Sequence, residues 1–151
     1  MFSIDDLTEC HAKQICDWRY LNEYEVYNCP SWDTIVSHAW GLADESKRKN
    51  EFKSIKLHNI FIGFFRLHFY ESKLHLSLGL MPEYCGSGHG SELIKLIIIY
   101  AKENYPQNDI HLAVRDFNIR AIKAYKKAGF FIEDSYMKNE INFISMKYIV
   151  S

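Results

Sequence analysis

Three glycines alternate with other residues in the stretch Gly86-Ser87-Gly88-His89-Gly90-Ser91. The stretch follows a segment of strict apolar alternation, 73–80, and precedes a segment with helical periodicity, 91–104. A strand that turns directly into a helix is typical of an α/β fold. Alternating glycines at such a turn let backbone N–H groups converge at the helix N-terminus, which favours an anion and phosphate above all. An ordinary glycine-rich turn without a ligand is the alternative.

The composition is that of a globular domain, with 48% hydrophobic and 25% charged residues. A length of 151 residues predicts a single domain, 1–151. The net charge of −1 leaves no basic surface field, so we expect no nucleic-acid partner. The longest purely apolar run, Leu96–Ile99, is too short to cross a bilayer, so we expect no membrane partner either.

The four cysteines are Cys10, Cys16, Cys29 and Cys85. Their spacings fit neither a zinc site nor a C-x-x-C redox pair. Because no secretory segment is in view, we expect free thiols in a reducing cytoplasm, and no metal site.

Periodicity and punctuation predict the order of elements. Helices are expected over 12–20 with Thr8 as N-cap, from Ser31 or Asp33 into the polar run 44–50, and over 91–104 and 118–128. Strands are expected over 2–4, 51–58, 59–70, 73–80, 109–115, 130–138 and 140–150. Gly129 occupies the position of a left-handed helix cap. This order predicts a mixed sheet of about six to seven strands with helices on both faces.

A second motif begins where the strand 109–115 ends. It reads V-x-x-x-N and continues as N-x-x-A-x-x-x-Y-x-x-x-G-F, and its members are Val114, Asn118, Ala121, Tyr125, Gly129 and Phe130. Together with Pro82, Gly88 and Gly90 of the glycine turn, it makes the chain resemble the GNAT superfamily of acyl-CoA N-acyltransferases. The two motifs span 78–130, about a third of the chain.

The resemblance implies an α/β GNAT fold whose sheet is splayed at its centre, with acetyl-CoA as cofactor. The strands 73–80 and 109–115 would diverge around the pantetheine arm, which would bond the backbone of Leu78 and Leu80. A bulge at Gly79 would help to separate these strands. The pyrophosphate would meet the loop formed by Cys85, Gly86, Ser87, Gly88, His89, Gly90 and Ser91. Cys85 departs from the family, which has Gln or Arg there; a tolerated small residue and a redox-sensing residue are the two readings.

The same resemblance implies catalytic roles. Tyr125 would donate a proton to the departing thiolate or hold it by a hydrogen bond; helical periodicity alone also fits a buried aromatic. Asn118 would contact the cofactor arm, a role compatible with that of a helix N-cap. The general base is open between Glu83, Glu25, His75 and a chain of waters.

An aromatic segment, 18–27, corresponds to one wall of the family's acceptor site. Tyr20, Tyr24 and Tyr27 would line it, and Glu25 or Glu23 would attract an amine, as aromatic faces also do. The alternative is that these aromatics close the core or a dimer contact. A basic cluster, Arg115, Arg120, Lys123, Lys126 and Lys127, is either a solvated face or a partial contact to the 3′-phosphate of the cofactor.

The sequence therefore predicts an N-acetyltransferase in which a primary amine attacks acetyl-CoA directly in a ternary complex. A small-molecule acceptor is favoured. The alternatives are a protein N-terminal acetyltransferase of the ribosomal-protein type and a catalytically silent acyl-CoA-binding module. A homodimer through 141–150 is a further implication of the resemblance.

Overall fold

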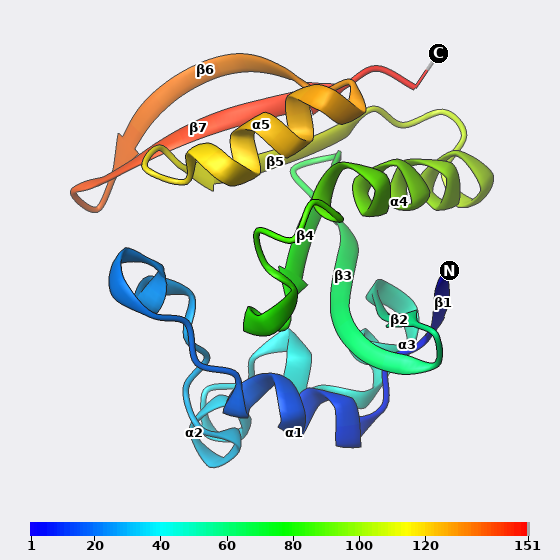
Figure 1. Ribbon diagram of the computed structural model, residues 1–151, viewed down its shortest axis with the longest axis vertical. Coiled ribbons are helices and arrows are strands. Elements are labelled where there is room, and N and C mark those ends of the chain that lie inside the picture. Colours follow the sequence, from blue (N-terminus) through cyan, green and yellow to red (C-terminus); the bar gives the residue numbers. More distant parts are fainter. Residues whose placement is uncertain (151) are drawn as a thin grey trace. The chain divides into compact units, whose positions relative to one another are not determined.

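The computed structural model describes residues 1–150 and shows two compact units (Figure 1). Unit 1 comprises Met1–Arg66 and Leu78–Cys85, and unit 2 comprises Leu67–Ser77 and the chain from Gly86 onward. Seven strands form one mixed sheet in the order β1-β2-β3-β4-β5-β7-β6. This confirms the predicted α/β fold with a mixed sheet, and the fourth and third strands each contribute to both units.

The strands of unit 1 follow the predicted ranges closely. They are β1 (Phe2–Asp6), β2 (Phe52–Leu57), the first part of β3 (Ile60–Tyr70) and the last part of β4 (Lys73–Leu80). The β1–β2 and β2–β3 pairs are antiparallel. In β2 the adjacent Ser54 and Ile55 are both buried, and Ile55 pairs with Ile4 and Gly63 of the neighbouring strands.

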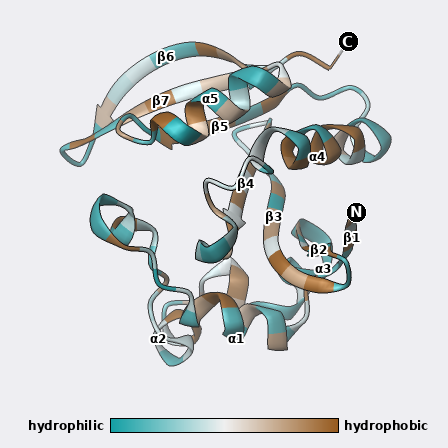
Figure 2. Ribbon diagram, viewed as in Figure 1, coloured by the Kyte–Doolittle hydropathy of each residue, from teal (hydrophilic) through white to brown (hydrophobic). Residues whose placement is uncertain are grey.

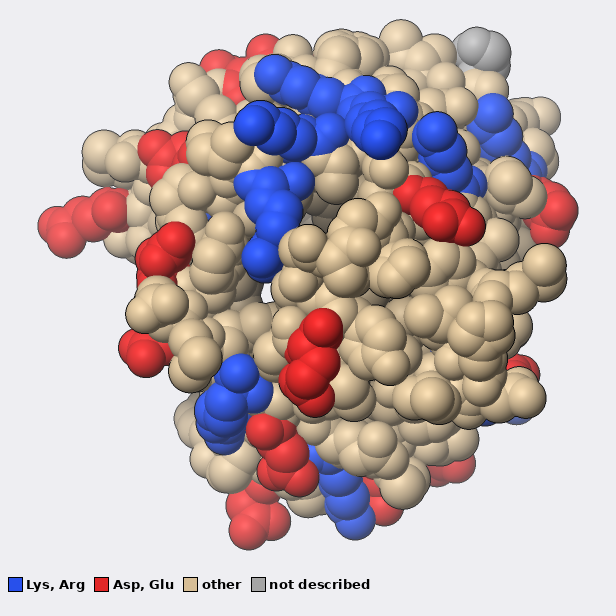
Figure 3. Space-filling view, viewed as in Figure 1, with Lys and Arg blue, Asp and Glu red and all other residues tan. Residues whose placement is uncertain are grey.

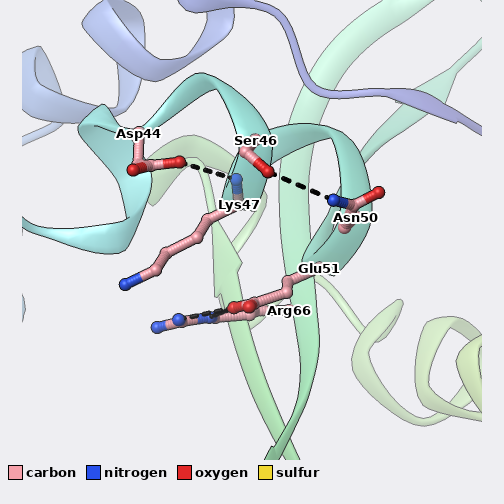
Figure 4. A network of polar contacts seen from close by, with 6 residues as sticks. All are labelled: Asp44, Ser46, Lys47, Asn50, Glu51 and Arg66. Atoms are coloured by element: carbon pink, nitrogen blue, oxygen red, sulfur yellow. Dashed lines mark hydrogen bonds and ion pairs between the residues drawn. The ribbon is translucent and has the colours of Figure 1, made fainter.

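The helices of unit 1 are short, and one prediction about them is wrong. They are α1 (Glu9–Asp17), η1 (Asn22–Tyr27), α2 (Trp32–Ser37), η2 (Gly41–Ala43), α3 (Glu45–Glu51) and η3 (Pro82–Tyr84), the η elements being 3-10 helices. The helix expected from Ser31 through 44–50 is interrupted. Ala39 takes a positive φ of 55°, which stops α2, and the Asp44 carboxylate then caps α3 afresh by accepting the Lys47 N–H at 2.9 Å (Figure 4).

Helix α1 lies earlier than the predicted range 12–20, because its cap sets its start. Thr8 is the N-cap, as predicted: its hydroxyl accepts the His11 N–H at 3.1 Å. His11 completes a capping box, since its Nδ1 accepts the Thr8 N–H at 3.1 Å. Trp18 then adopts an extended conformation and ends the helix before Arg19.

The core of unit 1 gathers side chains from its helices and strands. Its buried members are Leu7, Ala12, Ile15, Cys16, Trp18, Ile35, Leu42 and Phe52. Phe61 and Phe64 pack against this cluster, and the Trp18 ring lies 5.4 Å from that of Phe61 and 6.3 Å from that of Phe64. Arg66 and Glu51 form an ion pair of 2.6 Å that joins β3 to the end of α3 (Figure 4).

Gly79 of β4 is required by packing. A Cβ at this position would lie 2.9 Å from Cζ of Phe64 and within contact of two other atoms of its ring. We expect Gly79→Ala to destabilise the protein by about 1–3 kcal/mol, since the ring has to move off its place in the core. Urea unfolding measures this. If the clash is the cause, the loss should shrink in the double variant with Phe64→Leu; an undiminished loss would contradict it.

Unit 2 holds the remaining helices and strands. They are α4 (Gly90–Asn104), β5 (Ile110–Arg115), α5 (Ile119–Ala128), β6 (Phe131–Lys138) and β7 (Ile141–Tyr148). The helices α4 and α5 lie side by side (Figure 1). On α5, the buried Ile122 and Tyr125 alternate with charged residues, and Figure 2 shows this mixture of hydrophobic and hydrophilic residues. Gly129 caps α5 with a φ of 114°, as predicted.

The strand β5 has different pairing on its two sides. It pairs antiparallel with β7 along its whole length, from Ile110↔Tyr148 to Arg115↔Phe143. With β4 it pairs in parallel through Leu74↔Ile110 and His75↔His111. In the described part of unit 2, this parallel register extends over these two pairs.

Three connections between strands are two-residue turns. Both residues of each turn have positive φ: His58 and Asn59 between β2 and β3, Glu71 and Ser72 between β3 and β4, and Asn139 and Glu140 between β6 and β7. This matches the turn geometry that suits twisted antiparallel strands. Among residues 1–150, no helix combines the length and the apolar character needed to span a bilayer.

Candidate active site

The glycine turn of unit 2 has the backbone geometry of an anion site. Gly86 and Gly88 have φ angles of 74° and 86°, which side-chain-bearing residues rarely adopt. Helix α4 begins at Gly90, and its first-turn N–H groups have no partner within the helix. The helix dipole adds positive potential at the same end. A Cβ at Gly88 would meet no atom within 4 Å, so space for a ligand borders the backbone there.

Arg120 supplies a cation to this turn. A Cβ at Gly86 would lie 3.2 Å from Nη1 of Arg120, so the guanidinium lies directly beside the glycine backbone. Figure 3 shows Lys and Arg side chains gathered over α5, where Arg120, Lys123, Lys126 and Lys127 are exposed. The turn, the helix end and the guanidinium fit a phosphate group together.

The glycines of the turn are needed for different structural reasons. Gly90 lies against α5, because a Cβ there would be 3.3 Å from Cβ of Ala124, so this glycine serves the packing of α4 on α5. Gly86 and Gly88 serve the backbone conformation instead. In the sequence, Arg120 looked like one of five basic residues of a single cluster. Its place in the first turn of α5 was the sign that it could act on the glycine turn apart from the lysines.

The predicted catalytic pair of unit 2 lies on α5. Asn118 is the N-cap, and its Oδ1 accepts the Ala121 N–H at 3.2 Å. Tyr125 is 8% exposed, and its ring meets Phe130 edge-on at 5.4 Å. Both alternatives considered for these residues, N-cap and buried aromatic, are therefore observed, and neither prevents a further role in catalysis.

The end of β4 in unit 1 directs its backbone groups in a defined way. The Met81 N–H donates to the Ile62 carbonyl of β3 at 2.7 Å. Successive residues of a strand direct their N–H and C=O groups to opposite sides, so those of Leu78 and Leu80 point away from β3. The Leu80 carbonyl accepts the Tyr20 hydroxyl at 2.5 Å. The Leu80 carbonyl therefore bonds the Tyr20 side chain and not the neighbouring strand β3.

Cys85 gains a physical explanation that the sequence did not offer. Its Sγ lies 3.7 Å from each of the carbonyl oxygens of Leu80 and Met81. The single proton of this weak donor can bond either carbonyl, and the Leu80 carbonyl also accepts the Tyr20 hydroxyl. A small donor suits this half-buried position, where the resemblance implied Gln or Arg.

The aromatic acceptor segment folds onto itself in unit 1. Tyr24 and Tyr27 stack with ring centroids 6.4 Å apart, and Tyr20 meets Tyr27 edge-on at 6.4 Å. Glu23 and Glu25 are exposed on η1, the same 3-10 helix that carries Tyr24 and Tyr27. The segment thus combines carboxylates with aromatic rings, and both kinds of side chain attract an ammonium group.

The three side chains considered as general base lie in different surroundings. Glu83 is exposed in the single turn of η3, and Glu25 is exposed in η1. His75 lies in unit 2 between two other imidazoles, with ring centroids 6.0 Å from His68 and 6.0 Å from His111. Burial lowers the pKa of His111, and the nearby Glu133 carboxylate partly opposes this shift.

In residues 1–150 no group of three or more His, Cys, Asp or Glu side chains is placed to hold a metal ion.

Comparison with known proteins decides the family. The family model described as the acetyltransferase (GNAT) family matches residues 12–130, most of the chain. The chain belongs to the GNAT acetyltransferase family. It is therefore an acyl-CoA-dependent N-acetyltransferase, and acetyl-CoA is its acyl donor. No curated protein matched the sequence.

Solved structures similar to this acetyltransferase share its fold at low sequence identity. A chimera of the spermidine N-acetyltransferase SpeG from Vibrio cholerae and hSSAT is 17% identical, with a TM-score of 0.74 over 99% of this chain and 95% of that one. Aminoglycoside acetyltransferase AAC(6')-Ib in complex with coenzyme A is 17% identical, with a TM-score of 0.75 over 97% and 94%. The ribosomal-protein-S18-alanine N-acetyltransferase from Escherichia coli is 17% identical, with a TM-score of 0.68 over 100% and 95%.

Proposed function

We propose that this acetyltransferase acetylates the primary amine of a small molecule by direct attack in a ternary complex. The observation that carries the proposal is the glycine turn of unit 2, where open space borders Gly88 and the Arg120 guanidinium lies beside Gly86. Such a turn suits the diphosphate of acetyl-CoA. Acetyl-CoA supplies an acetyl thioester that an amine can attack without an acyl-enzyme.

The diphosphate would be held mainly by backbone N–H groups. We assign this to the turn and the helix start, Cys85, Gly86, Ser87, Gly88, His89, Gly90 and Ser91. Arg120 adds a charge-assisted hydrogen bond, which is about twice as strong as a neutral one. The exposed lysines of α5 extend the positive surface toward the 3′-phosphate. The cofactor assignment thus depends on geometry that tolerates Cys85 in place of Gln or Arg.

We assign the polarisation of the thioester carbonyl to backbone groups at the end of β4. The carbonyl oxygen of Leu80 already accepts the Tyr20 hydroxyl, so the role of Leu80 falls on its N–H. Leu78 points the same way along the strand and would bond the pantetheine arm. Donors aimed at an oxygen that gains negative charge during the reaction lower the barrier.

We assign the general acid to Tyr125. The hydroxyl of a buried tyrosine can protonate the departing thiolate, or hold it by a hydrogen bond. Asn118 starts the same helix and would contact the cofactor arm while it caps α5. For the general base we favour Glu83, since its carboxylate is exposed to solvent and can pass a proton to water.

We assign the acceptor to the aromatic segment of unit 1. Tyr20, Tyr24 and Tyr27 offer faces to an ammonium group, and the Glu25 carboxylate offers the opposite charge. A protein N-terminus is the second candidate, because the similar structures include an enzyme named for ribosomal protein S18 as well as enzymes named for spermidine and aminoglycosides.

The test is a transfer assay with acetyl-CoA and a panel of amines. The panel contains a polyamine, an aminoglycoside and a short peptide with a free N-terminus, and acetylated product is measured by mass spectrometry. We expect product with a small amine. Product from the peptide alone would favour protein acetylation, and tight binding of coenzyme A with no product from any amine would indicate a silent acyl-CoA-binding module.

A further inference from the structure

The segment 17–28 forms a loop whose two ends meet. Arg19 fastens it from one side: Nη1 donates to the carbonyls of Cys16 at 2.9 Å, Trp18 at 2.8 Å and Cys29 at 3.4 Å. Asn28 fastens it from the other side, accepting the Tyr20 N–H at 2.6 Å and lying 3.4 Å from its carbonyl. A compact loop with joined ends is an Ω-loop, a class that is often functional. We call the two joined ends of the loop, held by the hydrogen bonds of Arg19 and Asn28, its neck.

Two thiols lie at this neck. Sγ of Cys16 and Sγ of Cys29 are 3.5 Å apart, and they belong to the first residue before the loop and the first residue after it. Cys16 is 2% exposed, whereas Cys29 is half-buried. The sulfur atoms of a disulfide are about 2.05 Å apart, so a small rotation of the two side chains would bring them to bonding distance.

The other two cysteines have different surroundings. Cys10 is exposed on α1 beside Gln14, and the thiol of Cys85 faces the carbonyls of Leu80 and Met81. Sequence spacing gave no sign of a pair, because twelve residues separate Cys16 from Cys29. The folding of the loop, rather than a motif, brings these two thiols together.

We propose that Cys16 and Cys29 are a redox-sensitive dithiol that a small-molecule disulfide, such as oxidised glutathione, converts into a disulfide across the neck. The Cys29 thiolate attacks one sulfur of the small disulfide, forming a mixed disulfide and releasing one small thiolate. The Cys16 thiolate then attacks Sγ of Cys29, forming the protein disulfide and releasing the second thiolate. Two protons leave the protein thiols, and two electrons reduce the small disulfide to two thiols.

The order of attack follows from access and acidity. Burial raises the pKa of Cys16 to about 12, with Cys29 and Asp17 raising it further and Arg19 lowering it. Burial also raises the pKa of Cys29, while the hydrogen bond from Cys16 and the charge of Arg19 lower it. The half-buried Cys29 is the thiol that a small disulfide can reach. Since thiolates are the reacting species, the reaction should be slow at neutral pH and faster at alkaline pH.

The disulfide would change the freedom of the loop. Arg19 and Asn28 hold the neck by hydrogen bonds, which open and close, whereas a disulfide holds it until a thiol reduces the bond. The tip of the loop carries η1 with Tyr24 and Tyr27. The bridge and its effect on loop mobility do not depend on the proposed function, but any effect on the acceptor does.

The experiment uses the full-length protein in glutathione buffers of increasing oxidised fraction. Remaining thiols are alkylated, and the product is analysed by peptide mapping. We expect a loss of about 2 Da from an internal disulfide joining the Cys16 and Cys29 peptides. Amide hydrogen exchange across 21–27 should slow on oxidation. Dithiothreitol should reverse both changes.

Cys29→Ser and Cys10→Ser are the matched variants, one inside the neck and one outside it. The first should lose both changes and the second should keep both, and circular dichroism checks that each is folded. The proposal is overturned if no buffer yields the bridge, if Cys16 pairs with Cys10 or Cys85 instead, or if exchange across 21–27 is the same before and after bridging. Binding of coenzyme A, measured alongside, reports on the proposed function separately.

Discussion

Gly88→Leu is expected to weaken the binding of coenzyme A by at least about 100-fold, or roughly 2.7 kcal/mol, while the protein still folds. The reason is that the space beside Gly88 is empty of protein atoms, so a leucine side chain fills the volume that we assign to the diphosphate. Isothermal titration calorimetry measures the affinity, and thermal unfolding measures the fold.

Gly88→Ala is the control that separates strain from bulk. Both variants place a Cβ on a backbone with a φ of 86°, so both carry the same conformational cost. We expect alanine to weaken binding less than leucine. Gly90 is a poorer test, since a side chain there would also meet Ala124 of α5. Unchanged affinity in the leucine variant would remove the phosphate assignment.

Tyr125→Phe is expected to lower kcat by about 10²–10⁴-fold with little change in the affinity for coenzyme A. Phenylalanine keeps the edge-on packing against Phe130 and loses only the hydroxyl, so the helix should stay in place. Steady-state kinetics with a working acceptor, together with calorimetry, separates the two quantities.

Tyr148→Phe is the matched control for this variant. Tyr148 also packs against Phe130 in unit 2, and we assign it no part in the reaction. It should retain nearly full activity. Equal losses in both variants would show that the hydroxyl of Tyr125 matters for structure rather than for proton transfer, and full activity in Tyr125→Phe would exclude the acid role.

The fold was largely predictable because its elements have strong local signals. Alternating leucines gave β4 its bounds, and Asn118 and Gly129 gave the bounds of α5. The break after α2 was missed because alanine is not a turn signal, although Ala39 adopts a positive φ there. The predicted ends of the strands differ from the observed ends by one or two residues. Pairing with neighbouring strands sets these ends, and the local sequence does not show it.

Only those parts of the candidate site could be predicted in which a sequence motif requires a particular backbone conformation. The glycine turn and the α5 helix start belong to that class. The position of Arg120 beside Gly86 depends on how α5 packs against α4, and the hydrogen bond from Tyr20 to Leu80 joins residues 60 positions apart. Contacts of that kind follow from tertiary packing, which no single-sequence pattern encodes.

The short connections of the sheet leave room for engineering. All six positions with left-handed backbone in the β2–β3, β3–β4 and β6–β7 turns carry side chains, and glycine is the residue that such turns favour at their second position. Introducing it in place of Ser72 and Glu140 should raise the stability by up to about 1 kcal/mol each, the relief of left-handed strain less the entropy that glycine loses, whereas Asn59 already suits this backbone. Thermal tolerance could thus be improved in increments, leaving every residue assigned to the chemistry as it stands.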